Sequence, residues 1–171
     1  ITPLHTGINF SDNLQDTNIP ETHKLFITND YNIKSNASFK YYIFENAEAP
    51  VLPGVIFLFH GLNEKKWDKY LPWAYKLTKE TGKKVILFPI AFHMNRAPHE
   101  WSDSRLMNRV ATARARKTSN SNSSFANAAL SERLELRPQR FFLSGLQTYI
   151  DFCTLIELMR SGRIENIPSN S

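Results

Sequence analysis

Two short runs of consecutive apolar residues, 55–59 and 85–90, dominate the hydrophobic pattern of the chain. Neither run alternates with polar positions, and each has the length of a strand. Such runs are typical of strands buried on both faces of a parallel sheet. We therefore predict two core strands, each followed at its carboxyl end by a polar loop.

The segment between these runs predicts an amphipathic surface helix. Its apolar positions recur at spacings of three and four, at Trp67, Leu71, Ala74 and Leu77. Pro72 interrupts the pattern, so either a short first turn stops at Leu71 or Pro72 sits in the first turn of the main helix. Gly82 suits the residue that follows the helix. Strand, helix and strand in this order predict a right-handed βαβ unit.

Weaker patterns precede the first core strand. Residues 1–22 are polar and are broken by prolines, which predicts an irregular lead-in. Residues 24–28 and 39–44 have strand composition, and the polar segment between them suits a hairpin connection. The expected fold class is α/β, with early antiparallel strands and then a βαβ unit with parallel strands, in a partial domain over residues 23–171.

The composition changes after the second core strand. Residues 103–140 are rich in Arg, Ser and Asn, which predicts an exposed polar loop or an insertion. Ser102 and Asp103 are suited to cap the start of a helix in the Arg-rich part.

A final amphipathic helix is expected over residues 145–161, capped by Ser144 and ended by Gly162. On it, Cys153 is expected to be a buried structural thiol. The predicted apolar side consists of Leu146, Tyr149, Ile150, Cys153, Ile156 and Leu158 or Met159.

Composition narrows the possible partners. The net charge of +5 and the pI near 9.4 permit attraction to nucleic acid or anionic surfaces without establishing it. The single cysteine excludes an internal disulfide and a Cys-based zinc site. No apolar run approaches the roughly 20 residues that cross a bilayer, so we expect no membrane partner. The compartment stays open between the cytoplasm and export after leader removal.

Candidate chemistry follows the two core strands. His60 and Gly61 come directly after the first, and a loop with His93 and Asn95 follows the second. Ligands bind at the carboxyl ends of strands in open α/β sheets, so we expect the two loops to lie side by side. The alternative for the first loop is structural, with the glycine relieving a tight turn and the histidine bonding to nearby backbone.

A metal site is the other alternative for these loops. The residues that would form it are His60, His93, His99 and Glu100, which carry imidazole and carboxylate groups. Their spacing matches no established metal motif, so we predict no metal and no other cofactor.

The order of these elements, with His60-Gly61-Leu62 after the third expected strand, resembles the front half of the α/β-hydrolase fold, including bacterial members of it. The resemblance implies that the Leu62 N–H helps to hold a tetrahedral oxyanion and that His60 orients this loop. It also implies a Gly-x-Ser-x-Gly nucleophile elbow, followed by an acid and a histidine. No two of the six glycines are four residues apart, so the elbow is not in this chain. Either that machinery follows Ser171, or the protein is not a serine hydrolase.

Three functions therefore remain open. The first is a serine hydrolase acting on an ester or amide, of which this chain supplies the oxyanion-loop half and is inactive by itself. Its partners would be a small acyl substrate and the C-terminal half of the same domain. The second is a non-catalytic α/β domain for ligand or partner binding. The third is a basic nucleic-acid-binding module that uses residues 105–117. A solvated face or flexible lid is the simpler role for them, so we expect no nucleic-acid partner.

Overall fold

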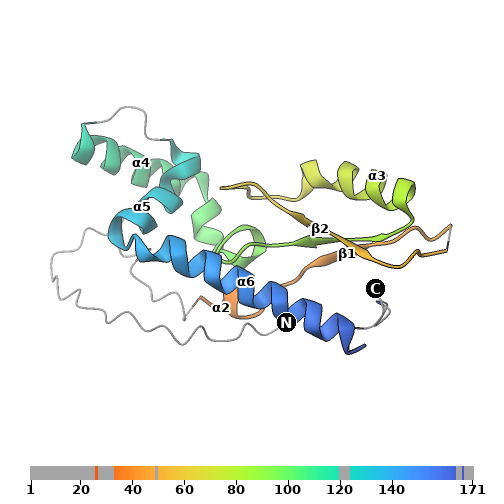
Figure 1. Ribbon diagram of the computed structural model, residues 1–171. Coiled ribbons are helices and arrows are strands. Elements are labelled where there is room, and N and C mark those ends of the chain that lie inside the picture. The colour runs from red at the N-terminus through yellow and green to blue at the C-terminus, as the bar shows by residue number, and fades with distance from the viewer. Residues whose placement is uncertain (1–25, 27–32, 49, 120–123, 165–166, 168–171) are drawn as a thin grey trace.

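The computed structural model describes residue 26 and residues 33–48, 50–119, 124–164 and 167 (Figure 1). It shows a small three-stranded mixed sheet surrounded by helices. The elements in chain order are α2 (Lys34–Ala37), β1 (Tyr42–Phe44), β2 (Val55–Phe59), η2 (Asp68–Tyr70), α3 (Leu71–Thr81), β3 (Lys84–Phe88), η3 (Met94–Arg96), η4 (His99–Ser102), α4 (Ser104–Thr118), η5 (Phe125–Asn127), α5 (Ala128–Leu136) and α6 (Gln139–Arg160).

The sheet has the strand order β1-β3-β2. β2 pairs with β3 in parallel, from Val55 opposite Lys84 to Phe59 opposite Phe88, which confirms the predicted βαβ unit. β1 pairs with β3 antiparallel, with Ile43 opposite Ile86. The mixed α/β class predicted from the sequence is therefore confirmed.

Burial differs between the two core strands. All five residues of β3 are buried, as expected for a central strand. β2 was predicted to be buried on both faces, and this was wrong: its first four residues are half-buried, and Phe59 is 42% exposed. The reason is position, because among the described residues β2 pairs only with β3 and forms an edge of the sheet.

Helices cover both faces of the sheet (Figure 1). On one face, Tyr70 and Ala74 pack against Val85 and Leu87. On the other face, α6 contributes Leu155 and Met159, which pack with Ile86, Phe88 and Phe39. Aromatic edge-to-face contacts extend this second core to β2, where the ring of Phe57 lies 4.7 Å from that of Phe152.

The α3 helix forms as its sequence predicts. A 3-10 turn over Asp68–Tyr70 precedes it, and Pro72 lies in its first turn, where a missing N–H costs no helical hydrogen bond. Gly82 ends the helix with a φ of 67°, and its N–H donates to the Thr78 carbonyl. This left-handed conformation is the one that favours glycine after a helix.

The early strands differ from prediction. β1 is three residues long and pairs with β3, not in a hairpin with residues 24–28. Of that segment only Phe26 is described, and it is helical and buried. Likewise β3 ends at Phe88 instead of at position 90, because Pro89 has no N–H and the Ile90 N–H donates to His60. Residues 1–22 lie outside the described residues.

The last helix was predicted too short, and its inward face was predicted only in part: Met159 is buried as expected, but most of the other predicted positions are half-buried or exposed. α6 begins at Gln139, so Ser144 lies inside the helix and does not cap it. Tyr149, placed on the apolar side, is 66% exposed, and Cys153 is only half-buried. The helix ends at Arg160, and Gly162 follows it with a φ of 67°. The buried side consists of Arg140, Ser144, Gln147, Asp151, Leu155 and Met159.

Helices also occupy most of the segment 103–140. Asp103 caps α4 as predicted, because its side chain accepts from the Leu106 N–H at 2.8 Å. α4 and α5 pack together in a third core that includes Phe92 and Trp101 from the loop after β3. This helical end therefore builds one wall beside the carboxyl ends of β2 and β3.

Candidate functional site at the carboxyl edge of the sheet

His60 joins the loops that follow β2 and β3. Its Nε2 accepts a hydrogen bond from the Ile90 N–H at 2.9 Å, and because an amide can only donate, the ring proton must be on Nδ1. Nδ1 donates to the Gly61 carbonyl, also at 2.9 Å. Burial lowers the pKa of His60 to about 4, against a smaller opposing effect of the Gly61 bond. The imidazole is therefore a neutral brace at neutral pH, not a proton acceptor for catalysis.

The Gly61–Leu62 turn presents a backbone donor at this edge. The Gly61 N–H donates to the Tyr70 hydroxyl at 2.6 Å, while the Gly61 carbonyl is held by His60. Leu62 is 66% exposed, and no acceptor for its N–H occurs within the described part of the chain. The turn is thus fixed by its neighbours and leaves one N–H available.

Asn63, and not Gly61, has the unusual backbone in this turn. Its φ is 65°, in the left-handed region that Asn tolerates better than most residues. A Cβ added at Gly61 would meet its nearest atoms at ordinary contact distance, 3.6 Å from Glu64 and Tyr70 side-chain oxygens. The Asn63 side chain also donates to the Ala126 carbonyl at 2.6 Å and contacts Asn127. The turn is therefore anchored to the helical end as well.

The loop after β3 holds His93 between two strained residues. Phe92 and Met94 have φ values of 63° and 52°, and such backbone costs roughly 1–3 kcal/mol at a non-glycine residue. His93 Nδ1 donates to the Ala91 carbonyl at 2.9 Å, which leaves Nε2 as an acceptor. Nε2 is buried and has no partner among the described residues. The ring centroids of His60 and His93 are 5.7 Å apart, so the two predicted loops do meet.

The other residues considered in this loop do not join them. Asn95 is exposed, and its side chain donates to the Lys40 carbonyl at 2.8 Å. His99 and Glu100 are exposed as well. Over the described ranges, no group of three His, Cys, Asp or Glu side chains is suited to a metal ion.

A buried ion pair, which the sequence did not predict, fixes this loop to α6. The guanidinium of Arg96 contacts the Asp151 carboxylate at 2.6 Å, and both side chains are fully buried. Gln147 donates to the other carboxylate oxygen at 2.7 Å, and Asn36 accepts from Arg96 Nε at 2.9 Å. Burial raises the pKa of Asp151 against the opposing effect of Arg96. The sequence has no local signal for this pair, because its two members lie 55 residues apart along the chain.

Two α6 hydroxyls complete the attachment. The Thr148 hydroxyl accepts from the Ala91 N–H at 3.0 Å, and the Ser144 hydroxyl donates to the Ala91 carbonyl at 2.9 Å. The polar buried side of α6 is thus explained by its contacts, because its hydroxyl groups pair with backbone groups of the loop that would otherwise be buried without partners.

Residues 7–171 match a family of unknown function, DUF6051. The chain belongs to that family. Comparison with curated proteins and with solved structures found no match.

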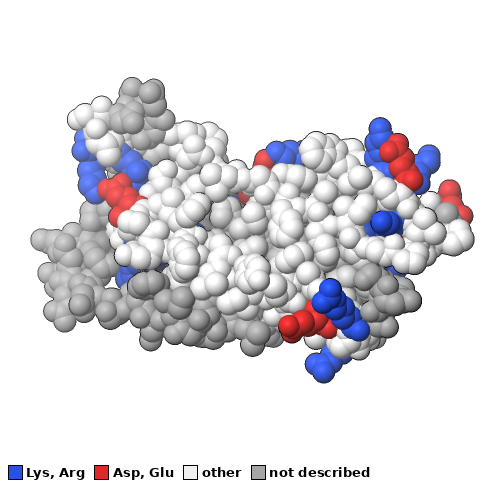
Figure 2. Space-filling model, in the orientation of Figure 1, with Lys and Arg blue, Asp and Glu red and all other residues white. Residues whose placement is uncertain are grey.

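In the DUF6051 chain, acidic side chains neutralise part of the positive charge of the Arg-rich segment 105–117. Arg114 contacts Glu132 and Glu135 at 2.6 Å, and Lys117 contacts Glu135 at the same distance. Figure 2 shows acidic and basic side chains together at the helical end, with a largely uncharged surface between the two ends of this face. These contacts favour the structural interpretation of residues 105–117.

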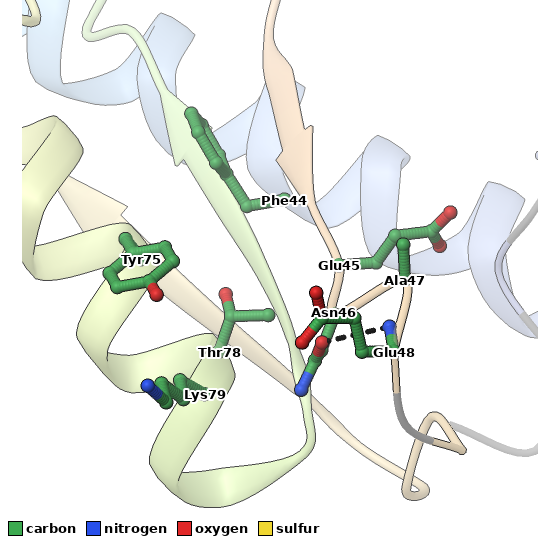
Figure 3. A pocket seen from close by; sticks show the side chains of 8 residues that line it. All are labelled: Phe44, Glu45, Asn46, Ala47, Glu48, Tyr75, Thr78 and Lys79. Atoms are coloured by element: carbon green, nitrogen blue, oxygen red, sulfur yellow. Dashed lines mark hydrogen bonds between the residues drawn. The ribbon is translucent and has the colours of Figure 1, made fainter.

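A pocket of about 270 Å³ in the DUF6051 chain lies away from this edge (Figure 3). It is formed where β1 ends, beside the second half of α3, with Phe44, Glu45, Asn46, Ala47, Glu48, Tyr75, Thr78 and Lys79 as its lining. Its contacts are local, such as the Asn46 side chain accepting from the Glu48 N–H at 3.0 Å.

Among the described residues, no helix has the length and apolar character of a membrane span.

Proposed function

We propose that this chain provides the oxyanion-loop half of a serine hydrolase of the α/β-hydrolase type, which acts on an ester or amide. The observation that carries the proposal is the braced Gly61–Leu62 turn at the carboxyl end of β2. His60 and Tyr70 hold both backbone groups of Gly61, and the Leu62 N–H has no acceptor among the described residues. A fixed donor of this kind stabilises a developing oxyanion without reorganising.

The second oxyanion donor, the serine and its acid and histidine partners would come from residues after Ser171. The unpaired edge of β2 supports a domain whose catalytic groups come from two parts of the sequence. β2 pairs only with β3 among the described residues, so its other edge is available to a further strand. α6 contacts β2 through Phe152, which packs against Phe57 and Phe59. The same helix exposes Phe141, Phe142 and Tyr149 by 66%, 62% and 66%. Such an apolar surface suits the remainder of a domain core.

The role of the Leu62 N–H can be tested in the complete gene product with a p-nitrophenyl ester. L62P removes the N–H, and L62A keeps it while removing the same exposed side chain. We expect L62P to lower kcat by roughly 10²–10³ and L62A to change it by less than about threefold. Circular dichroism would check that both variants fold. Equal activity of the two variants would refute the oxyanion role, and inactivity of the wild type would favour a non-catalytic binding domain.

A further inference from the structure

The pocket between β1 and α3 lies at the end of the sheet opposite to His60. β1 runs antiparallel to β3, with Phe44 opposite Val85, so the end of β1 meets the start of β3. The pocket therefore shares no residue with the carboxyl edge. Its volume of about 270 Å³ is just below the roughly 300–1,000 Å³ that is typical of sites for drug-sized ligands. This volume favours a smaller ligand, of the size of a free amino acid.

Two segments far apart in the sequence form the walls of the pocket. Tyr75 and Lys79 come from α3, and residues 44–48 come from the end of β1 and the loop after it (Figure 3). Phe44 is half-buried and packs against the core beneath α3, so it gives the pocket an apolar wall. The Tyr75 ring is 65% exposed. An exposed aromatic ring beside a cavity gains burial when an apolar group of a ligand covers it.

The pocket also carries one negative and one positive charge that the described residues do not balance. Glu45 is paired with Lys84 at 2.6 Å. Glu48, in contrast, forms no ion pair in the described part of the chain. The Lys79 ammonium lies 5.9 Å from the centroid of the Tyr75 ring and has no carboxylate partner within the same residues. A ligand with both an ammonium and a carboxylate group complements this arrangement.

We infer that the pocket binds a free amino acid with an apolar side chain. Its carboxylate pairs with Lys79 and its ammonium with Glu48, while its side chain lies between Phe44 and Tyr75. Asn46 supports this arrangement, because its side-chain oxygen accepts from the Glu48 N–H at 3.0 Å and fixes the backbone next to that carboxylate. The amide nitrogen of Asn46 remains a donor for the ligand. Charged hydrogen bonds at both ends and an apolar centre thus define the ligand class.

Calorimetric titration of the complete gene product at pH 7 with L-leucine and with L-phenylalanine tests the site. We expect saturable binding of at least one of them. E48Q and K79Q should each weaken it by at least about fivefold, because each removes a charged hydrogen bond. E80Q and K76Q remove the same charges from exposed positions of α3 outside the pocket and should leave the affinity unchanged.

Two derivatives of leucine test the two ends of the ligand separately. N-acetyl-L-leucine lacks the ammonium charge and L-leucinamide lacks the carboxylate, so both should bind at least about fivefold more weakly than leucine. Absence of saturable binding of both amino acids would overturn the inference. Equal affinity of the wild type, E48Q and K79Q would overturn it as well, because the ligand would then bind elsewhere.

The inference does not rest on the proposed hydrolase function, because the pocket and the Gly61–Leu62 turn are separate. A protein that binds leucine with this dependence on Glu48 and Lys79 but hydrolyses no ester retains the amino-acid site and loses the proposed function. A protein that hydrolyses an ester and binds neither amino acid gives the reverse result.

Discussion

The two faces of the sheet and its carboxyl edge are stabilised by different kinds of interaction. Both faces are packed with apolar side chains, such as Leu87 toward α3 and Ile86 toward α6. The edge is held by hydrogen bonds and charges instead, in which His60 joins two loops and Arg96 binds Asp151. Burial of apolar area tolerates small changes in geometry, whereas buried polar groups are costly unless every partner is in place. A site that needs fixed backbone donors is therefore held better by buried hydrogen bonds and ion pairs than by apolar packing.

The largest expected effect comes from breaking the ion pair at this edge. D151L should lower the free energy of unfolding by about 3–5 kcal/mol, because it leaves the Arg96 charge buried without its carboxylate. The double variant R96M/D151L should recover much of that loss. E157A, at an exposed position of the same helix, should stay within about 0.5 kcal/mol of the wild type. These values come from urea unfolding, and a D151L loss below about 1 kcal/mol would contradict the account.

The next effect is a loss of stability in acid. The pKa of His60 is about 4 in the folded protein against an ordinary value of 6.5, so the unfolded chain binds a proton that the folded protein does not. Stability is therefore complete above about pH 6.5 and falls toward pH 4, by roughly 3 kcal/mol if His60 acts alone. His93 contributes with the same sign, because its pKa is also lowered.

Urea midpoints at pH 7.5, 6.0 and 5.0 measure this dependence. H60Q should have a flatter profile than the wild type, and H99Q, at an exposed histidine, should keep the wild-type profile. Identical profiles for the wild type and H60Q would show that His60 is not the buried neutral brace.

The smallest effect concerns the support of the turn itself. Y70F removes the acceptor of the Gly61 N–H and should cost about 1 kcal/mol, with faster hydrogen exchange at the Gly61 amide. Y75F, at a tyrosine of α3 that is 65% exposed, is the matched control and should change neither quantity. Unchanged exchange at Gly61 in Y70F would mean that the turn is held by other contacts.

The contrast between apolar packing on the sheet faces and polar contacts at the carboxyl edge also explains which features the sequence could predict. Apolar runs identified β2 and β3, and Gly82 marked the end of α3, because these features follow from local periodicity and backbone preference. The inward face of α6 could not be read in this way. Asp151 is buried because Arg96 lies 55 residues earlier in the chain, and no local pattern contains that distance.

The candidate site was predictable only in outline. The position of His60 and His93 after neighbouring parallel strands predicted that their loops meet, and they do. Asn95 follows the same strand but turns outward, because a loop of this length has no periodicity that fixes side-chain direction. The left-handed Asn63, which anchors the turn to η5, likewise had no marker in the sequence.

The most direct test of the central claim is labelling of the complete gene product with a fluorophosphonate probe, followed by mass spectrometry of the modified peptide. The account predicts stoichiometric labelling of one serine after Ser171, within a Gly-x-Ser-x-Gly sequence, and slower labelling in L62P than in L62A. A correctly folded protein that takes up no label would contradict the claim and leave this edge of the sheet as a binding site without catalysis.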